Sequence, residues 1–528
     1  MRSLALIGFM GSGKTSVGRE LARRLGWPFV DTDELVERRA GRPIPEIFAR
    51  DGEATFRALE REAVREVARM HPAVIACGGG VPLDPANVLE LRRTCRLVLL
   101  QADLHTVLAR VGDAADRPLL QGDPEGRAQR LLLERAPRYR EVADLVVDTS
   151  RLGVAAAAER ILEEVARLER RTLEIALPHH RYPVHVGCGI LPLVALDLLR
   201  AGVRRAVLLT HPHLWRRYGE GLVAALRAWG VEAHPVLVSP GERSKTLAAA
   251  RRVYQAMAAS RLDRTSGVLA LGGGVVGDLG GFVAATYMRG IPLFLLPTTL
   301  LAQVDASIGG KTALNLTARN LIGAFWQPAA VVSDVATLQS LPARELRAGL
   351  AEAIKHAAIA DEGLFAWLEG HLPAILRRNP EALTELVARN AAIKARFVTA
   401  DERETSGVRE ALNFGHTVAH ALEAALDYRI PHGEAVAQGM VAEARLAVRL
   451  GLLRPMEFDR LTALLERADL PTRLAPLGPR ELLDRMFLDK KVRAGWLRFA
   501  LPERIGRVRT GVPVEPQLVL EILQESQR

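Results

Sequence analysis

The chain has little lysine, little cysteine and few aromatic side chains for its 528 residues. Its three cysteines, Cys77, Cys95 and Cys188, are odd in number and scattered, so no disulfide framework is expected. The longest apolar stretch, residues 291–302, is interrupted by Pro297 and falls short of the roughly 18 residues of a membrane-spanning helix. The first residues lack the small-residue cleavage site of a secretory signal. These absences favour a soluble, cytoplasmic protein with no membrane partner.

Lysine accounts for only seven of the 71 lysine and arginine residues, which leaves 64 arginines. A solvated surface cation can be either residue, whereas lysine alone offers a compact, flexible ammonium with a tunable pKa. We therefore expect the lysines to mark sites, although leftovers of a compositional drift would also explain them. They are Lys14, Lys245, Lys311, Lys355, Lys394, Lys490 and Lys491.

The net charge of +10 would permit nucleic-acid binding. However, the arginines are dispersed without a basic tail, and aromatic residues make up only 5% of the chain. Small anionic substrates fit this composition better, so no nucleic-acid partner is predicted.

The apolar patterning predicts an α/β fold of several domains. In residues 1–168, short strands at 4–7, 74–76, 97–100 and 145–147 alternate with helical stretches such as 56–70, which predicts a parallel sheet. A closing helix is predicted over 153–171. Residues 172–335 form a second α/β region, with strands at 206–210, 235–238, 267–271, 293–296 and 330–333. Residues 336–528 are predicted to be α-helical at 345–360, 380–397, 417–426, 434–450 and 480–486, with one short strand at 496–501.

Residues 8–15 match the phosphate-loop pattern G-x-x-x-x-G-K-[ST] and follow a predicted strand. Gly11 and Gly13 let backbone N–H groups turn toward the phosphates of ATP, and the helix that follows directs its positive end at them. Lys14 would reach the outer phosphates, and Thr15 would ligate Mg²⁺.

Carboxylates and arginines follow the neighbouring strands of this region. Asp31 and Asp33 come after a strand at 28–30, where one carboxylate can hold Mg²⁺ and the other can accept a hydroxyl proton, although a helix cap is the alternative. Two arginines and a glycine turn suit a substrate with a carboxylate and ring hydroxyls; these residues are Arg57, Gly79, Gly80 and Arg135. Arg117 lies in a polar stretch expected to close as a lid.

Residues 1 to about 165 resemble shikimate kinase through the phosphate loop, D-T-D, F-R-x-x-E, the G-G-G turn, R-P-L-L and E-R-x-P-x-Y. The resemblance implies that shikimate is bound by Asp33, Arg57, Gly79, Gly80 and Arg135. It implies that Mg²⁺ is bound at Thr15 and Asp31. It also implies that Asp33 is the base and that Arg117 is the lid arginine. The segment at 111–116 lacks the glycine run expected of the lid.

A second glycine loop, G-x-G-x-x-G at 272–277, follows the predicted strand 268–271. A pyrophosphate could rest on it at the helix start, but the acidic residue expected about 20 positions later is missing, so an ordinary tight turn remains an alternative. Thr298 and Thr299, after the next strand, offer hydroxyls to the same crevice.

One glutamate and several histidines have the pattern of a catalytic zinc site. Glu352 lies in a predicted helix, His416 and His420 share a helical face, and His432 opens another helix. One Glu and two His with an open fourth position are typical of catalytic zinc, but spacing alone leaves His356 and His420 as competing ligands. Groups suited to a substrate bearing both carboxylate and phosphate surround them: Asp305, Lys311, Arg319, Asn320, Lys355, Lys394, Arg409, Asn413, Lys490 and Lys491.

Residues 172–528 resemble 3-dehydroquinate synthase. The matching segments are G-E-R-S-K at 241–245, G-G-G-V-V-G-D, P-T-T-L-L-A-Q-V-D-A-S-I-G-G-K-T, A-E-x-I-K-H, D-E-R-E, L-N-F-G-H-T-x-x-H and H-G-E-A-V. The resemblance implies a Rossmann-like half at 172–335, an α-helical half at 336–528, and the NAD-dependent conversion of a seven-carbon sugar acid phosphate to 3-dehydroquinate. It also implies small-molecule substrates and a homodimer formed through this unit.

The same resemblance implies residue roles. It assigns Zn²⁺ or Co²⁺ to Glu352, His416 and His432, and a hydrogen bond to substrate to His420. NAD would contact Glu242, Lys245, Gly273, Gly274, Asp278, Thr298, Thr299 and Asp305. Substrate would contact Lys311, Asn320, Lys355, Lys394, Arg409, Asn413 and one of Lys490 and Lys491. Arg319 stands where the family pattern leads us to expect lysine.

Two alternatives are open. A metal-dependent polyol or glycerol dehydrogenase shares the glycine loop and the metal helix, but it has no use for the cations at Lys311, Lys355, Lys394 and Arg409. A nucleotide-sensing or regulatory module would explain the phosphate loop, but not the substrate clamp at Asp33, Arg57 and Arg135.

Overall fold

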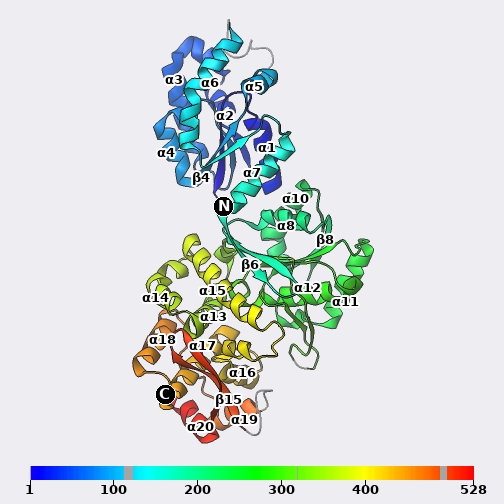
Figure 1. Ribbon diagram of the computed structural model, residues 1–528, viewed down its shortest axis with the longest axis vertical. Coiled ribbons are helices and arrows are strands. Elements are labelled where there is room, and N and C mark those ends of the chain that lie inside the picture. The colour runs from blue at the N-terminus through cyan, green and yellow to red at the C-terminus, as the bar shows by residue number, and fades with distance from the viewer. Residues whose placement is uncertain (1, 112–122, 318, 488–495, 528) are drawn as a thin grey trace. The chain divides into compact units, whose positions relative to one another are not determined.

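The computed structural model describes residues 2–111, 123–317, 319–487 and 496–527. The chain folds into two compact units (Figure 1): residues 1–170 with the short segments 192–196 and 220–232, and the remainder up to residue 528. Across the described residues, no helix combines the length and the apolar character that a membrane span requires.

The first unit is built on a parallel five-stranded sheet in the order β2-β3-β1-β4-β5. All five residues of the central strand β1 are buried, because helices cover both faces of the sheet (Figure 1). The strands are β1 (Ser3–Ile7), β2 (Phe29–Asp31), β3 (Val74–Ala76), β4 (Cys95–Gln101) and β5 (Leu145–Asp148). The helices are α1 (Lys14–Leu25), α2 (Thr32–Ala40), α3 (Ile44–Val67), α4 (Pro85–Thr94), α5 (Leu104–Val111), α6 (Pro124–Val142) and α7 (Val154–Glu169).

The second unit begins with a seven-stranded sheet in the order β6-β7-β14-β11-β10-β8-β9. Its central strands pair in parallel from β7 through β14, β11 and β10 to β8. The strands are β6 (Arg170–Ala176), β7 (Arg181–Gly187), β8 (Arg205–Thr210), β9 (Glu232–Leu237), β10 (Gly267–Gly272), β11 (Leu293–Pro297) and β14 (Ala330–Asp334). The longer helices of this stretch of the chain are α8 (Val194–Arg200), α10 (Glu220–Ala228), α11 (Leu247–Ala259) and α12 (Gly274–Thr286), of which α10 and the start of α8 are grouped with the first unit. A hairpin of β12 (Lys311–Leu314) and β13 (Ile322–Phe325) follows β11.

Helices dominate the rest of the chain, as predicted. They are α13 (Ala343–Ala360), α14 (Glu362–Leu376), α15 (Pro380–Ala400), α16 (His416–Ala425), α17 (His432–Arg449), α18 (Pro455–Arg467), α19 (Pro479–Phe487) and α20 (Pro516–Glu525). Their buried faces join those of the seven-stranded sheet in one hydrophobic core. A hairpin of β15 (Leu497–Arg504) and β16 (Arg507–Val514) lies among them.

Several predicted elements need correction. The closing helix ends at Glu169, and Arg170 already begins strand β6. Strands β6 and β7 were not predicted, because their arginines and Pro183 interrupt the alternation of apolar and polar residues that is typical of a strand. The single short strand predicted at 496–501 is a two-stranded hairpin, whose second strand contains Gly511 and Pro513.

Candidate active sites

The phosphate loop of the first unit connects β1 to α1 in a conformation that requires glycine. Gly8 has a φ of 145°, and a Cβ there would lie 2.4 Å from the Leu100 carbonyl oxygen. Gly13, with a φ of 96°, is the N-cap of α1. The Lys14 ammonium donates to the carbonyls of Gly8 (3.0 Å) and Phe9 (2.9 Å). The lysine thus lies across its own loop, where a phosphate can replace the carbonyls as its partner.

Asp31 is both a helix cap and a partner of the loop. Its Oδ1 accepts from the Asp33 N–H (3.0 Å) at the start of α2, so the helix-cap interpretation is correct. Its Oδ2 accepts from the Thr15 hydroxyl (2.8 Å). A hydroxyl and a carboxylate in contact are the hard oxygen ligands that Mg²⁺ prefers, so this pair fits the predicted ion.

The predicted substrate clamp gathers in the same cleft. Arg57 pairs with Glu60 (2.9 Å) and Glu53 (3.0 Å), and a Cβ at Gly80 would lie 2.0 Å from its guanidinium. Burial raises the pKa of Glu60, although Arg57 opposes this shift. One cleft is lined by all the predicted residues of this site that the structure describes: Gly11, Gly13, Lys14, Thr15, Asp31, Asp33, Arg57, Gly79, Gly80 and Arg135. Arg117 and the lid segment 112–116 lie outside the described residues.

In the second unit, the glycine loop joins β10 to α12, with Gly273 as the N-cap. A Cβ at Gly273 would lie 3.0 Å from the Thr299 methyl carbon, so the predicted threonine and the loop face the same crevice. Thr298 follows β11 and is buried. The backbone N–H groups at the start of α12 could bind a pyrophosphate, and the absence of a side chain at Gly273 leaves room for it to come close to the backbone.

A polar network surrounds Lys245 beside this loop. Its ammonium contacts Asp278 Oδ2 (2.6 Å), Asn320 Oδ1 (2.5 Å) and Glu242 Oε1 (3.6 Å). Burial raises the pKa of Asp278, and Lys245 opposes the shift. Asn320, expected at the substrate, therefore lies among the residues predicted to bind NAD. Arg319 places its guanidinium 4.0 Å from the centre of the Tyr428 ring and within 4.0 Å of Glu423.

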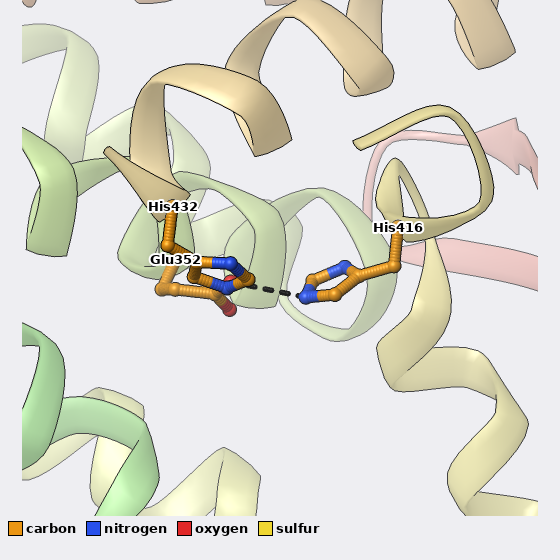
Figure 2. A group of neighbouring side chains, drawn as sticks. All are labelled: Glu352, His416 and His432. Atoms are coloured by element: carbon orange, nitrogen blue, oxygen red, sulfur yellow. Dashed lines mark ion pairs between the residues drawn. The ribbon is translucent and has the colours of Figure 1, made fainter. Parts of the chain in front are cut away.

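Glu352 of α13, His416 of α16 and His432 of α17 point toward one another (Figure 2). The Nε2 atoms of both histidines lie 3.3 Å from Glu352 Oε1, and the three ligand atoms lie within 4.8 Å of one another. The other ring nitrogens are occupied: His416 Nδ1 is 3.2 Å from the Phe414 carbonyl, and His432 Nδ1 is 3.3 Å from Glu423 Oε1. Such acceptors hold the proton on Nδ1 and leave Nε2 for a metal. The donor set fits Zn²⁺ or Co²⁺.

The charges of this cluster shift one another's pKa values. Burial would raise the pKa of Glu352, but Lys355 and His416 hold it well below its usual range. Burial and Lys355 lower the pKa of His416 to about 4. For His432, burial is outweighed by Glu352 and Glu423, which raise its pKa to about 10. The two histidines therefore differ in their electrostatic surroundings, because His432 lies between the carboxylates of Glu352 and Glu423.

The predicted cations lie around this cluster. Lys355 contacts Glu352, and both side chains are almost fully buried. Lys394 contacts Asp305 Oδ1 (2.5 Å), which also lies 3.3 Å from His356 Nε2. His356, an alternative ligand in the sequence, also contacts Asn390 through Nδ1 (3.2 Å).

A loop carboxylate, Glu404, joins two further cations, because it contacts Lys311 and lies 3.2 Å from Arg409 Nε. Asn413 ends the turn 408–413 and is half-buried. His420 is exposed on α16, with its ring 5.5 Å from that of His416. Lys490 and Lys491 lie outside the described residues.

Comparison with known proteins identifies both units. A family model described as shikimate kinase matches residues 10–166, and models described as 3-dehydroquinate synthase N-terminal and C-terminal match residues 235–348 and 349–492. The 3-dehydroquinate synthase of Symbiobacterium thermophilum is 48% identical over 348 residues, which cover 65% of this chain and 97% of that protein. The chain belongs to the 3-dehydroquinate synthase family. Because a shikimate kinase domain precedes the synthase, the chain is a bifunctional enzyme, a kinase joined to a lyase.

Other relatives agree with this placement of the synthase unit. The 3-dehydroquinate synthase of Gloeobacter violaceus is 47% identical over 355 residues, which cover 66% of this chain and 98% of that protein. The structure of ValA, a 2-epi-5-epi-valiolone synthase from Streptomyces hygroscopicus with NAD⁺ and Zn²⁺ bound, is 30% identical, covers 66% of this chain and 98% of its own, and superposes with a TM-score of 0.60. These relatives favour the synthase over the polyol dehydrogenase alternative.

Sequence reasoning missed groups that support the predicted ones. In the kinase unit, Arg110 and Thr149 line the cleft; Arg110 donates to the Thr149 carbonyl (2.8 Å) and the Thr149 hydroxyl donates to the Ser12 carbonyl (3.0 Å). The position of Thr149 just beyond strand β5 was an available signal. In the synthase unit, Glu404 and Glu423 were missed. Glu404 closes the D-E-R-E segment at 401–404, which was an available signal, whereas no motif distinguishes Glu423 from a surface glutamate.

Proposed function

We propose that the synthase unit converts 3-deoxy-D-arabino-heptulosonate 7-phosphate to 3-dehydroquinate and phosphate, and that the kinase unit phosphorylates shikimate to shikimate 3-phosphate with ATP. Both reactions belong to aromatic amino-acid biosynthesis. The observation that carries the first assignment is that the Glu352–His416–His432 cluster is bordered by Lys355, with Lys394 and Arg409 nearby in the helical half. A substrate with both carboxylate and phosphate groups needs these cations, and an uncharged polyol does not.

We assign the metal to Glu352, His416 and His432. A divalent ion held by these three residues would supply a Lewis acid for the substrate oxygen at C5. NAD⁺ would be held by Lys245, Asp278 and the glycine loop, where it would supply a hydride acceptor.

The remaining residues of the synthase site bind and orient the substrate. Lys311 and Arg409 would exchange the Glu404 carboxylate for an anionic group of the substrate. Lys355, 2% exposed and in contact with Glu352, would direct its ammonium at an anionic group of the substrate beside the metal cluster. Lys394 is held by Asp305, while His420 and Asn413 donate hydrogen bonds to substrate hydroxyls.

In the kinase unit, the backbone of the phosphate loop and Lys14 hold ATP, and Mg²⁺ is bound with Thr15 and Asp31. Arg57 and Arg135 bind the shikimate carboxylate. Asp33, at the same edge of the sheet, accepts the proton of the reacting hydroxyl. Glu60 orients Arg57 through their 2.9 Å contact.

We further propose domain bounds of 1–168 for the kinase, 172–335 for the NAD-binding half and 336–528 for the helical half. ATP and NAD as co-substrate and cofactor favour the cytoplasm. A homodimer through the synthase unit would cover Leu316, Leu321 and Phe325, which are exposed around hairpin β12–β13; light scattering of the purified protein tests it.

Two assays on one preparation test the assignment. With NAD⁺, Zn²⁺ and the seven-carbon phosphate substrate, the protein should release phosphate without accumulating NADH. With shikimate and ATP–Mg²⁺, it should form ADP. Steady NADH accumulation without phosphate release would instead favour the dehydrogenase, and absence of shikimate-dependent ADP would refute the kinase assignment.

A further inference from the structure

Glu443 is a buried carboxylate of α17 that contacts the backbone on both sides of a proposed metal ligand. It is 1% exposed. Its Oε2 accepts from the N–H of Gly415 (2.7 Å), and its Oε1 accepts from the N–H groups of Thr417 (3.0 Å) and Val418 (3.2 Å). Between these donors stands His416, the first residue of α16.

Helix α16 needs this cap from outside. Its N-cap is Gly415, with a φ of 80° and no side chain to accept from the first N–H groups, which have no partner within a helix. A carboxylate at the positive end of a helix is also electrostatically favourable. A Cβ at Gly439 would lie 2.0 Å from the Gly415 carbonyl oxygen, so the glycine in α17 permits the close approach.

The two helices hold each other's ligand. Helix α16 carries His416 and also Glu423, whose carboxylate lies 3.3 Å from His432 Nδ1. Helix α17 carries His432 and also Glu443, which holds the backbone around His416. A ligand on each helix is thus fixed by a carboxylate of the other helix.

We propose that Glu443 is a positioning residue for the metal centre. By fixing the first turn of α16, it keeps His416 Nε2 directed at Glu352 Oε1 before the metal arrives, so that binding requires less ordering. This inference rests on the proposed function only in that the three-residue cluster binds a divalent metal.

The test measures metal affinity in the full-length, metal-free protein. Zn²⁺ is titrated against a competing chelator for the wild type, Glu443→Gln and the ligand variant His416→Ala. Loss of an outer-shell partner typically weakens metal binding by about 10–100-fold, and we expect that weakening in Glu443→Gln. Its visible spectrum with Co²⁺ should also differ from that of the wild type, because the coordination geometry loosens.

Asp334→Asn is the matched control, because Asp334 is also buried and accepts from three backbone N–H groups, those of Gly189 (2.7 Å), Leu191 (2.9 Å) and Ala336 (2.9 Å). This variant should lower the melting temperature while leaving the zinc dissociation constant unchanged.

A Glu443→Gln protein that melts early like the control, yet binds zinc within twofold of the wild type, overturns the proposal. If Glu443→Gln does not fold, Glu443→Asp is measured instead, and wild-type affinity there overturns it equally. Unchanged binding in His416→Ala would refute the proposed metal site and this inference with it, whereas weakened binding there beside unchanged Glu443→Gln refutes the inference alone.

Discussion

At the scale of single residues, each of the five lysines that the structure describes places its ammonium against a carboxylate or a carbonyl inside a candidate site. Lys14 contacts Gly8, Lys245 contacts Asp278, and Lys394 contacts Asp305. The side chains of Lys245, Lys355 and Lys394 are at most 9% exposed. A compact ammonium fits these enclosed positions, whereas the planar guanidinium of arginine is larger and needs more space for its N–H groups. The arginines, by contrast, include many exposed partners of helix-surface glutamates, such as Arg19 and Arg167.

Lys311→Arg tests whether a lysine at the substrate site is needed for its shape rather than for its charge alone. Lys311 is 53% exposed in its side chain, so arginine fits without disturbing the core. We expect phosphate release to fall by about 10²-fold, because the anionic end of the substrate would be misplaced by about 1 Å, while the melting temperature stays unchanged. Lys355→Arg is a poorer test, because overpacking at a buried site costs about 1–3 kcal/mol. Wild-type turnover in Lys311→Arg would mean that this position does not require lysine, and that Lys311 only remains from the drift in composition toward arginine.

Glu404→Gln should strengthen anion binding at the same place. The Glu404 carboxylate contacts Lys311 and Arg409, so an incoming anion must compete with it. Removing a partly exposed ion pair of about 0.5–1 kcal/mol should lower the inhibition constant of inorganic phosphate several-fold. Glu410→Gln, on an exposed neighbour, is the control. Equal or weaker phosphate inhibition in Glu404→Gln would show that the loop carboxylate does not compete.

At the scale of helices and strands, the sequence predicts elements whose burial pattern is simple. The buried strands β1, β3, β10 and β11 are continuous apolar runs, and they lie within one residue of the predicted positions. Strand β6 and hairpin β15–β16 were missed or shortened, because their stability comes from partners distant in sequence rather than from local pattern. The ligand glutamate was recognisable from its motif, whereas Glu423 and Glu443 acquire their roles only when α16 packs against α17.

Glu457 links helix α18 to the turn of hairpin β15–β16, and its contribution should depend on pH. Its carboxylate accepts from the Ile505 N–H (3.1 Å) and contacts Arg454 (3.0 Å). Burial would raise the pKa of Glu457, but Arg454 and the Ile505 N–H outweigh it, so the pKa is lowered. A lowered carboxyl pKa adds stability above the unfolded pKa of about 4.3, and this stability is lost as the pH falls through the folded pKa.

The prediction is therefore that Glu457→Gln lowers the free energy of unfolding by about 1–2 kcal/mol at pH 7. The difference from the wild type should shrink progressively below about pH 4.3. Urea unfolding at several pH values measures it, with the exposed Glu515→Gln as control. A difference that is constant from pH 7 to pH 3 would mean that the ionised carboxylate is not the stabilising form.

At the scale of the whole molecule, each unit has its own sheet, and each candidate site is built from residues of a single unit. The kinase cleft is lined by residues between 10 and 157, and the metal cluster comes from three helices between 343 and 449. The two proposed reactions also need different ions, because the kinase pair of a hydroxyl and a carboxylate suits Mg²⁺ and the imidazole-containing cluster suits Zn²⁺. It should therefore be possible to abolish the activity of one unit while the activity of the other unit is retained.

Two treatments of the full-length protein should separate the activities in opposite directions. A chelator that binds Zn²⁺ much more tightly than Mg²⁺, such as 1,10-phenanthroline, should abolish phosphate release and leave shikimate-dependent ADP formation intact, because only the second site has nitrogen ligands. Asp33→Asn should do the reverse: loss of the base should cost about 10²–10⁴-fold in the kinase reaction and leave phosphate release unchanged. Added Zn²⁺ should restore phosphate release in the chelated wild type. If the chelator silenced the kinase, or if Asp33→Asn silenced the synthase, the two sites would be coupled through the chain. That result would refute the independence of the two activities.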